Sequence, residues 1–213
     1  MTRPLRVAIL DYDAGNVRSA RRGFDAAGAD ARITRDPVEA DAADALVIPG
    51  VGHFASCLTQ LKASGLIAVL QGAIDEQRPV FGICVGMQLL YSHSEEGDSA
   101  GLGLLPGVVQ RFKTGTRVPH MGWDVVTPTA HPDANRLLHG IAGERMYFAH
   151  SYFGVPDNNT HVVATTTYGG TTFPSLVVTG SVVGTQFHPE KSGAAGVALL
   201  ANWLQSHASR SAA

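Results

Sequence analysis

The chain has 213 residues, 45% of them hydrophobic and 16% charged, and its formal net charge is −2. This balance is typical of a globular domain, and because no basic block is present it argues against a nucleic-acid or anionic-membrane partner. Two cysteines cannot form a disulfide scaffold, no apolar run reaches the length of a transmembrane helix, and the N-terminus lacks a signal-peptide core. We therefore expect a single cytoplasmic domain over residues 1–213.

In the first part of the chain, short apolar runs alternate with stretches of helical periodicity. Strands are expected at residues 6–10, 29–34, 45–48 and 79–83. Helices are expected at residues 16–27, 54–61 and 87–91. In the first helix, Val17, Ala20 and Phe24 share one face, and Gly28 ends the pattern. Strands that alternate with helices in this way predict βαβ units around a parallel sheet.

The second half has a different pattern, with few helical stretches between its strands. Strands are expected at residues 108–112, 147–152, 161–167, 175–179 and 182–187. Turn signals such as Gly169-Gly170 separate them, which predicts antiparallel hairpins attached to the parallel sheet. A last helix is expected at residues 193–206, and the tail over residues 207–213 is expected to fray.

Cys84 follows an apolar strand and precedes a helical stretch, with Gly82 and Gly86 at the spacing G-x-C-x-G. This pattern is typical of a nucleophile elbow, a tight turn at which glycines let the backbone bend sharply and place the sulfur at a helix N-terminus. There the helix dipole favours the thiolate, and free backbone N–H groups can bind an oxyanion. The pentapeptide alone is equally compatible with a buried structural cysteine. Cys57 lies in a helical stretch without such a turn, and we expect it to be structural.

A cysteine nucleophile needs a base, and His188 follows an apolar strand in the segment His188-Pro189-Glu190. Glu190 can accept a hydrogen bond from the imidazole, which would fix the tautomer of His188. The alternative is a surface loop in which Glu190 pairs with Lys191. A zinc site of the deaminase type is excluded because neither cysteine lies in a C-x-x-C motif, and we expect no metal.

Glycines at other positions carry weaker signals. Gly50 and Gly52 follow an apolar strand and could supply an oxyanion donor or form an ordinary turn. No G-x-x-x-x-G-K-[ST] motif occurs, which disfavours a nucleotide phosphate loop. Gly101 and Gly103 fail the dinucleotide fingerprint, since Pro106 stands where its third glycine belongs. We expect no cofactor.

Three motifs at distant positions form a combination that is more specific than any one of them. They are Pro49-Gly50-Val51-Gly52, Gly82-Ile83-Cys84-Val85-Gly86-Met87-Gln88 and Gln186-Phe187-His188-Pro189-Glu190. Together they resemble the triad-type, class I glutamine amidotransferases. Further motifs resemble the glutaminase subunits of imidazole glycerol phosphate synthase, an enzyme of histidine biosynthesis; they lie at residues 11–16, 102–104, 118–123, 150–152 and 188–192.

The resemblance implies a flavodoxin-like, three-layer α/β/α fold whose central sheet is mostly parallel, with antiparallel hairpins added in the second half. It implies that Cys84 is the nucleophile, His188 the general base and acid, and Glu190 the residue that orients His188. It also implies that Gly52 and Val85 belong to the oxyanion hole.

Two sets of contact residues follow from the same resemblance. Glutamine would be held by Gly50, Gln88, His150, Ser151 and Tyr152. A partner subunit would face Tyr12, Asn16, His120, Met121, Trp123 and Lys191. Trp123 could equally be a core residue. Asp13 and Asp124 depart from the family pattern, which usually has Gly and Asn there, and these departures bear on partner contacts rather than on the chemistry.

The implied activity is hydrolysis of glutamine to glutamate and ammonia. The ammonia would pass through a channel to a (β/α)8-barrel cyclase subunit in a heterodimer, whose lyase step makes imidazole glycerol phosphate and an aminoimidazole carboxamide ribotide. The isolated chain would be weakly active until partner binding reorients the loop at residues 50–52. Little chain follows Glu190, so we expect the synthase to be a separate polypeptide.

Three alternatives remain at this point. The chain could serve a different synthase within the same amidotransferase group. It could be a stand-alone cysteine hydrolase or peptidase on a related fold, although the motifs at residues 119–123 and 188–192 exceed what a triad needs. It could also be a non-catalytic binding module, although Cys84, His188 and Glu190 are all present.

Overall fold

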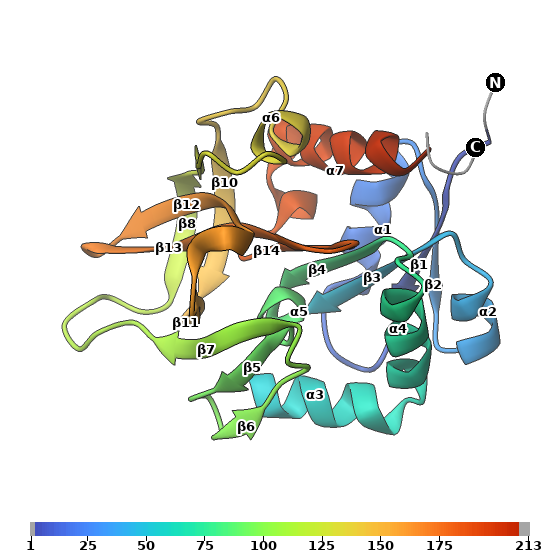
Figure 1. Cartoon of the computed structure of the whole chain (residues 1–213), viewed down its shortest axis with the longest axis horizontal. Helices are drawn as coiled ribbons and strands as arrows, with labels where there is room; N and C mark the ends of the chain where they lie inside the picture. Colours follow the sequence, from blue (N-terminus) through green and yellow to red (C-terminus); the bar gives the residue numbers. More distant parts are fainter. Residues whose placement is uncertain (1–2, 209–213) are drawn as a thin grey trace.

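Short aliphatic runs form the centre of the molecule, because such runs favour strands that are buried on both faces. In the computed structural model, which describes residues 3–208, β1 (Arg6–Leu10), β2 (Asp30–Thr34), β3 (Ala45–Gly50) and β4 (Val80–Cys84) pair in parallel. β14 (Val182–Thr185) joins the free edge of β4, also in parallel. The resulting order, β2-β1-β3-β4-β14, is that of a flavodoxin-like sheet, as expected (Figure 1).

The sheet continues with antiparallel strands, which confirms the expected change of pattern. β13 (Thr171–Thr179) pairs with β14, and β12 (Val162–Tyr168) forms a hairpin with β13 through Gly169 and Gly170. Both glycines have positive φ, of 55° and 74°, which the tight turn requires. The short β9 (Thr127–Pro128) completes the sheet, which has eight strands within residues 3–208.

Two smaller sheets lie beside the main one. β8 (His120–Val125) pairs with β10 (Arg145–His150). The other sheet contains β11 (Tyr152–Pro156), β7 (Leu105–Arg111), β5 (Tyr91–Ser94) and β6 (Ser99–Ala100). The single strand predicted at residues 147–152 is therefore wrong: the chain on either side of Ser151 pairs with different sheets, and alternation of apolar residues cannot reveal that change of partner.

Helices cover both faces of the main sheet, which gives the three-layer arrangement (Figure 1). α1 (Val17–Ala26) and α7 (Gly193–Ala208) lie on one face and contact each other. α2 (Pro37–Asp41), α3 (Phe54–Ala63) and α4 (Leu66–Asp75) lie on the other.

Several helical predictions need correction or extension. The sequence did not predict α4, which follows α3 after Gly65 in a left-handed conformation. Of the helix predicted at residues 87–91, only the end of α5 (Val85–Gln88) is helical, because Tyr91 begins β5. α7 continues to Ala208, and residues 209–213 of the tail predicted to fray lie outside the described residues.

The shorter helical segments complete the secondary structure. They are α6 (Ala134–Leu137), η1 (Asn159–His161) and η2 (Pro189–Lys191).

Three aromatic side chains fasten one helical layer to the strand that carries Cys84. Phe24 of α1, Phe81 of β4 and Trp203 of α7 make three mutual edge-to-face contacts, with ring centroids 5.2–5.8 Å apart. All three are fully buried. Such pairs add to the free energy of burial, so this cluster holds β4 rigidly under α1 and α7.

No single helix in residues 3–208 is both long and apolar enough to cross a membrane. The pair formed by α3 and α4 meets that criterion only when joined, across a bend of 92°.

Candidate active site

The backbone at Cys84 is strained in the way that a nucleophile elbow requires. Cys84 joins β4 to α5 with φ 53° and ψ −108°, a conformation that L-residues rarely adopt. A Cβ atom at Gly86 would lie 1.9 Å from the carbonyl oxygen of Ile48, and one at Gly82 would lie 2.8 Å from the oxygen of Gly86. The two glycines of G-x-C-x-G are therefore needed for close backbone approach.

The carboxyl ends of three parallel strands bring the predicted motifs together. In the register of β3 and β4, Gly50 lies opposite Cys84. β14 runs beside β4, with Thr185 opposite Ile83, and leads directly to His188. This edge of an open α/β sheet is where such folds place their ligand sites.

His188 and Glu190 form a buried pair. His188 Nδ1 lies 2.8 Å from Glu190 Oε1, and each side chain is at most 2% exposed. Because the carboxylate can only accept, Nδ1–H donates to it and Nε2 is left for Cys84. The backbone of His188 is held by its own N–H, which donates to the oxygen of Tyr147 at 2.8 Å, and by Ser192 Oγ, which donates to its carbonyl at 2.7 Å.

The charges around His188 favour its imidazolium form. Burial alone would lower the pKa of His188, but the interactions with Cys84 and Glu190 outweigh burial and raise it to about 10. Cys57 differs, because burial raises the pKa of its thiol to about 11. Its Sγ lies 3.7 Å from the oxygen of Val51, and the side chain is 2% exposed, as expected of a structural cysteine.

A cavity of about 180 Å³ opens beside the sulfur of Cys84. Its lining comprises Val51, Gly52, Cys84, Val85, Gln88, Glu96, Pro119, Ala149, His150, Ser151 and Tyr152. The lining thus includes six of the seven residues predicted for the oxyanion hole and the glutamine site. Gly50 is not among them: it is buried, and a Cβ there would lie 2.7 Å from Gly86 N, so it makes room for the elbow instead.

The two predicted oxyanion positions differ in their surroundings. Val85 is the first residue of α5, where a helical N–H has no partner within the helix. Gly52 has φ 109° and is exposed, and a Cβ there would meet nothing within 4 Å. Glycine is therefore required at position 52 by backbone conformation and not by space.

Two further residues, Gln186 and Glu96, belong to this site although the sequence motifs predicted no role for either. Gln186 is fully buried; its Nε2 lies 3.7 Å from Cys84 Sγ, and its Oε1 accepts a hydrogen bond from Gln88 Nε2 at 3.0 Å. Gln186 lies within a motif that was noted, two residues before His188, so its position was a usable signal. Glu96 lines the cavity and accepts a hydrogen bond from Phe54 N at 2.8 Å. No motif marks Glu96.

The residues predicted to face a partner separate into two groups. Met121 and Trp123 are 64% and 51% exposed, so Trp123 is not a core residue. Lys191 is exposed, and its Nζ lies 5.8 Å from the ring centroid of Tyr147, which also contacts Trp123.

Other residues of that predicted set lie inside the chain. Tyr12 and His120 are each 2% exposed, so neither side chain presents a surface to a partner. The hydroxyl of Tyr12 instead donates to the carbonyl of Pro49, next to the glycine-rich segment. Asn16 is half-buried, and its Nδ2 donates to Glu190 Oε1 at 3.3 Å.

Both departures from the family pattern have partners within this chain. Asp13 has φ 65° and pairs with Arg35, whose Nη2 lies 2.5 Å from Asp13 Oδ1. Arg35 also pairs with Asp11 at 2.9 Å. Asp124 Oδ2 lies 3.1 Å from His120 Nε2.

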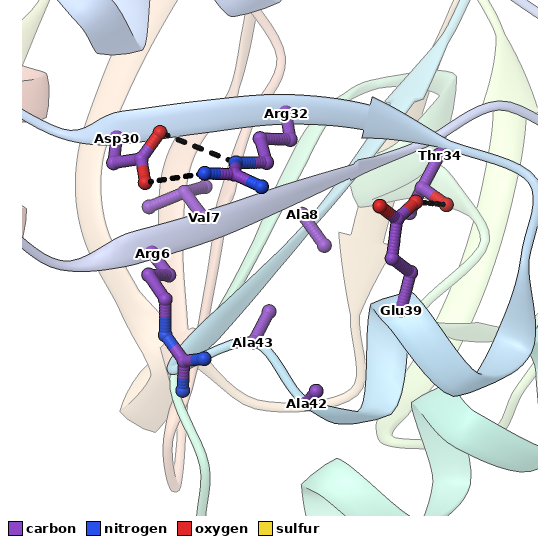
Figure 2. Close-up of a pocket in the computed structure, with 9 residues that line it drawn as sticks. All are labelled: Arg6, Val7, Ala8, Asp30, Arg32, Thr34, Glu39, Ala42 and Ala43. Atoms are coloured by element: carbon purple, nitrogen blue, oxygen red, sulfur yellow. Dashed lines mark hydrogen bonds and ion pairs between the residues drawn. The ribbon is translucent and has the colours of Figure 1, made fainter.

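A second cavity, of about 220 Å³, lies beside β1, β2 and α2 and contains none of the predicted site residues (Figure 2). Four of its polar side chains pair with each other: Arg32 pairs with Asp30 at 3.3 Å, and Thr34 Oγ1 donates to Glu39 at 2.6 Å (Figure 2). Arg6, which also lines the cavity, pairs with Asp44 at 3.3 Å. We therefore place the candidate active site at the cavity beside Cys84.

Comparisons with known proteins show the family to which the chain belongs. The family model for glutamine amidotransferase class-I matches residues 8–206. The imidazole glycerol phosphate synthase subunit HisH of Halobacterium salinarum is 47% identical over 207 residues, covering 93% of this chain and 92% of its own length. The subunit of the same name from Synechococcus sp. (strain JA-3-3Ab) is 44% identical, covering 94% of each chain.

Solved structures share the fold at lower identity. A structure described as glutamine amidotransferase has a TM-score of 0.73 and 20% identity, covering 95% of this chain and 98% of its own. A chain of PurLQS from Thermotoga maritima has a TM-score of 0.73 and 18% identity, covering 96% and 99%. The chain therefore belongs to the class I glutamine amidotransferases, and within them to the HisH family of glutaminase subunits.

Proposed function

We propose that Cys84, His188 and Glu190 form a catalytic triad that hydrolyses glutamine to glutamate and ammonia. The strained backbone at Cys84, with the buried pair of His188 and Glu190 after the neighbouring strand, supports these roles most directly. Nucleophile, base and orienting carboxylate in this order form the arrangement used for acyl transfer in cysteine enzymes.

The reaction begins with proton transfer from Cys84 to His188, and the raised pKa of His188 favours the resulting thiolate and imidazolium. The thiolate attacks the carbon of the glutamine side-chain amide, and the carbonyl oxygen becomes an oxyanion. When the tetrahedral intermediate collapses, the C–N bond breaks and His188 donates its proton to the leaving nitrogen, which departs as ammonia. Water, deprotonated by His188, then hydrolyses the glutamyl thioester and releases glutamate.

The lining of the cavity beside Cys84 supports glutamine as the substrate. The N–H of Val85, at the start of α5, would stabilise the oxyanion, and the segment at Gly52 would supply a second donor once the partner binds. One such donor is typically worth about 3–4 kcal/mol. Glu96 would offer its carboxylate to the α-ammonium group of the substrate, because opposite charges attract. Gln88, His150, Ser151 and Tyr152 also line the cavity and would hold the rest of the substrate.

Two known relatives are named as subunits of imidazole glycerol phosphate synthase, and we infer that this chain also acts with a partner subunit. The expected partner is a (β/α)8-barrel cyclase in the cytoplasm, which receives the ammonia and carries out the lyase step. Met121, Trp123 and Lys191 are the exposed residues that would contact it. Exposed aromatic and cationic side chains of this kind are common in protein interfaces.

Replacement of the nucleophile tests the proposal directly. Cys84→Ala removes the sulfur and should abolish glutamine hydrolysis, whereas Cys57→Ala should retain it, because Cys57 does not line the cavity. The assay measures glutamate release, and thermal unfolding confirms that each variant folds. Turnover by Cys84→Ala would remove Cys84 from its proposed role.

A further inference from the structure

A line of polar side chains joins Asp124, which is 32% exposed, to the wall of the cavity beside Cys84. Asp124 and His120 lie on β8, and His120 faces His150 across the pairing with β10. His120 Nε2 lies 3.1 Å from Asp124 Oδ2, and His120 Nδ1 lies 3.0 Å from His150 Nε2. His150 Nδ1 in turn lies 2.8 Å from the carbonyl oxygen of Tyr152.

The line continues to the sulfur. The carbonyl oxygen of Tyr152 also accepts a hydrogen bond from Gln88 Nε2 at 2.8 Å, and that nitrogen lies 3.0 Å from Gln186 Oε1. Gln186 Nε2 then lies 3.7 Å from Cys84 Sγ. His150, Tyr152 and Gln88 all line the cavity, so the order of this line determines the shape of the proposed glutamine site.

The protons at the inner end of the line can be assigned from the acceptors. A carbonyl oxygen only accepts, so His150 Nδ1 carries the proton that is donated to Tyr152. Burial lowers the pKa of His150 to about 3, so the ring is neutral and its Nε2 is an acceptor. His120 Nδ1 must therefore carry the proton of the His120–His150 hydrogen bond.

The contact between His120 and Asp124, at the outer end of the line, requires one more proton than a neutral histidine and a carboxylate supply. A neutral His120 that carries its proton on Nδ1 turns a lone pair toward the Asp124 carboxylate, which repels it. If the proton moves to Nε2, two lone pairs face each other between His120 and His150. Every contact is satisfied only when the His120–Asp124 pair holds an additional proton, whichever of the two partners carries it.

The surroundings of His120 can accept a cationic ring. It is stacked between Tyr168, with centroids 4.0 Å apart and an interplanar angle of 16°, and Phe148, at 4.7 Å and 18°. Aromatic faces attract a cation, while burial lowers the pKa of His120 and the Asp124 carboxylate opposes that shift. The groups around the ring from each packed element are Asp124 of β8, Phe148 and His150 of β10, Tyr168 of β12, Phe173 of β13, and Phe112 after β7.

We propose that Asp124 is a positioning residue for the glutamine site, and that the proton shared by Asp124 and His120 makes glutamine binding dependent on pH. This inference rests on the proposed function, because the cavity that the line shapes is the one assigned to glutamine. As the pH rises and that proton leaves, one hydrogen bond of the line is lost. The carbonyl of Tyr152 then loses its fixed position, and glutamine binds more weakly.

Asparagine at position 124 would remove this dependence. Its Nδ2–H group can donate to Nε2 of a neutral His120, which keeps its proton on Nδ1 for His150. The whole line is then satisfied without an additional proton. Asp124→Asn thus separates the hydrogen bond from the charge, and Asp124→Ala removes both.

Glutamine binding can be measured through the protection of Cys84 from alkylation. Iodoacetamide alkylates the cysteine, mass spectrometry quantifies the product, and the glutamine concentration that halves the rate is determined at each pH from 5.5 to 8.5. The pH dependence of the alkylation itself cancels, since rates with and without glutamine are compared at the same pH. Asp133→Asn is the matched control: Asp133 also lies beside a histidine, His131, at 3.8 Å, but neither residue lines the cavity.

For the unmodified chain and for Asp133→Asn, the half-protecting glutamine concentration should rise about threefold to tenfold across this range, which corresponds to the loss of one hydrogen bond. For Asp124→Asn it should stay constant, and for Asp124→Ala, which lacks the shared proton, it should also be independent of pH. Parallel pH profiles for the unmodified chain and Asp124→Asn would overturn the inference.

The ring nitrogens of His120 provide a readout that does not depend on glutamine. Nitrogen-15 NMR of the unmodified chain at pH 5.5 should show either both nitrogens of His120 protonated or Nε2 accepting a proton from the Asp124 carboxyl. In Asp124→Asn, the spectrum should show His120 Nε2 as a hydrogen-bond acceptor at every pH. If no variant is protected by glutamine, the proposed function fails, whereas NMR shifts of His120 that are identical and independent of pH in both proteins overturn the shared proton.

Discussion

Glu190 shows how far one side chain can control the chemistry of another. Its Oε1 accepts from His188 at 2.8 Å and from Asn16 at 3.3 Å. Gly23 of α1 makes this possible, because a Cβ there would lie 3.0 Å from that of Glu190. A carboxylate in this position holds the tautomer of His188 and stabilises its charged form.

Replacement of that carboxylate should be visible in the pH profile of glutamine hydrolysis. The Glu190 carboxylate contributes to the raised pKa of His188, so Glu190→Gln should lower that pKa. Because the imidazolium must protonate the leaving ammonia, the alkaline limit of activity should shift to lower pH, and the rate should fall by at least about tenfold. Glu39→Gln is a suitable control, since Glu39 bonds to Thr34 away from the site. An unchanged profile for Glu190→Gln would make Glu190 a bystander.

Individual residues also mark the limit of what sequence reasoning could find. Cys84, His188 and Glu190 lie in motifs with a chemical reason for each residue type, and the structure brings them together. The contact of Asn16 with Glu190 spans 174 positions, and that of Gln88 with Gln186 spans 98. Such pairings depend on the arrangement of the strands and leave no local pattern.

At the scale of secondary structure, the turn between β4 and α5 is the element on which the site depends. Gly86→Ala would place a methyl group 1.9 Å from the oxygen of Ile48 in β3, so β3 and α5 would have to separate. We expect the variant to unfold at a lower temperature, with a free energy of unfolding that is lower by about 1–3 kcal/mol. We also expect that glutamine no longer protects Cys84 from alkylation. Thermal unfolding and the protection assay measure both effects.

Gly72 offers a matched control for that substitution. It lies inside α4, and a Cβ there would meet nothing within 4 Å. Gly72→Ala should therefore stabilise the chain by about 0.5–1 kcal/mol, because alanine is the better helix former. Equal effects at the two positions would mean that the close approach at Gly86 is not required.

The elements that were predicted correctly are those with a strong local signal. Runs such as residues 6–10 and 45–48 become β1 and β3, since buried parallel strands are continuously apolar. α4 was missed because its residues Leu66–Asp75 are apolar on most sides and show little helical contrast. The split at Ser151 was missed because it reflects a change of pairing partner, which depends on distant strands.

At the scale of the molecule, His150, the buried histidine in the cavity wall, should lower the stability of the fold in acid. Burial lowers the pKa of His150 to about 3, so below about pH 6.5 the unfolded chain binds one proton more than the folded chain. The contribution of His150 to stability should therefore fall with decreasing pH, with a slope that grows from about 0.7 kcal/mol per pH unit at pH 6.5 to about 1.4 kcal/mol per pH unit near pH 5. Urea unfolding measures this slope, and His150→Gln should flatten it. A slope unaffected by that substitution would assign acid lability to other groups.

The exposed surface of β8 bears on whether the site works alone or within an assembly. Met121 and Trp123 project from β8, the strand whose inner face carries His120 and Asp124, so a protein bound to this surface would lie close to the glutamine site. We propose that binding there shifts the segment at residues 50–52 to a second conformation that completes the oxyanion hole.

The most direct test of the account is the rate of glutamine hydrolysis with and without the barrel cyclase subunit and its ribulosyl aminoimidazole carboxamide nucleotide substrate. We predict a rise by orders of magnitude when both are added, and no activity in either case for Cys84→Ala. A rate that the partner and its nucleotide leave unchanged would contradict the account and identify a free-standing hydrolase.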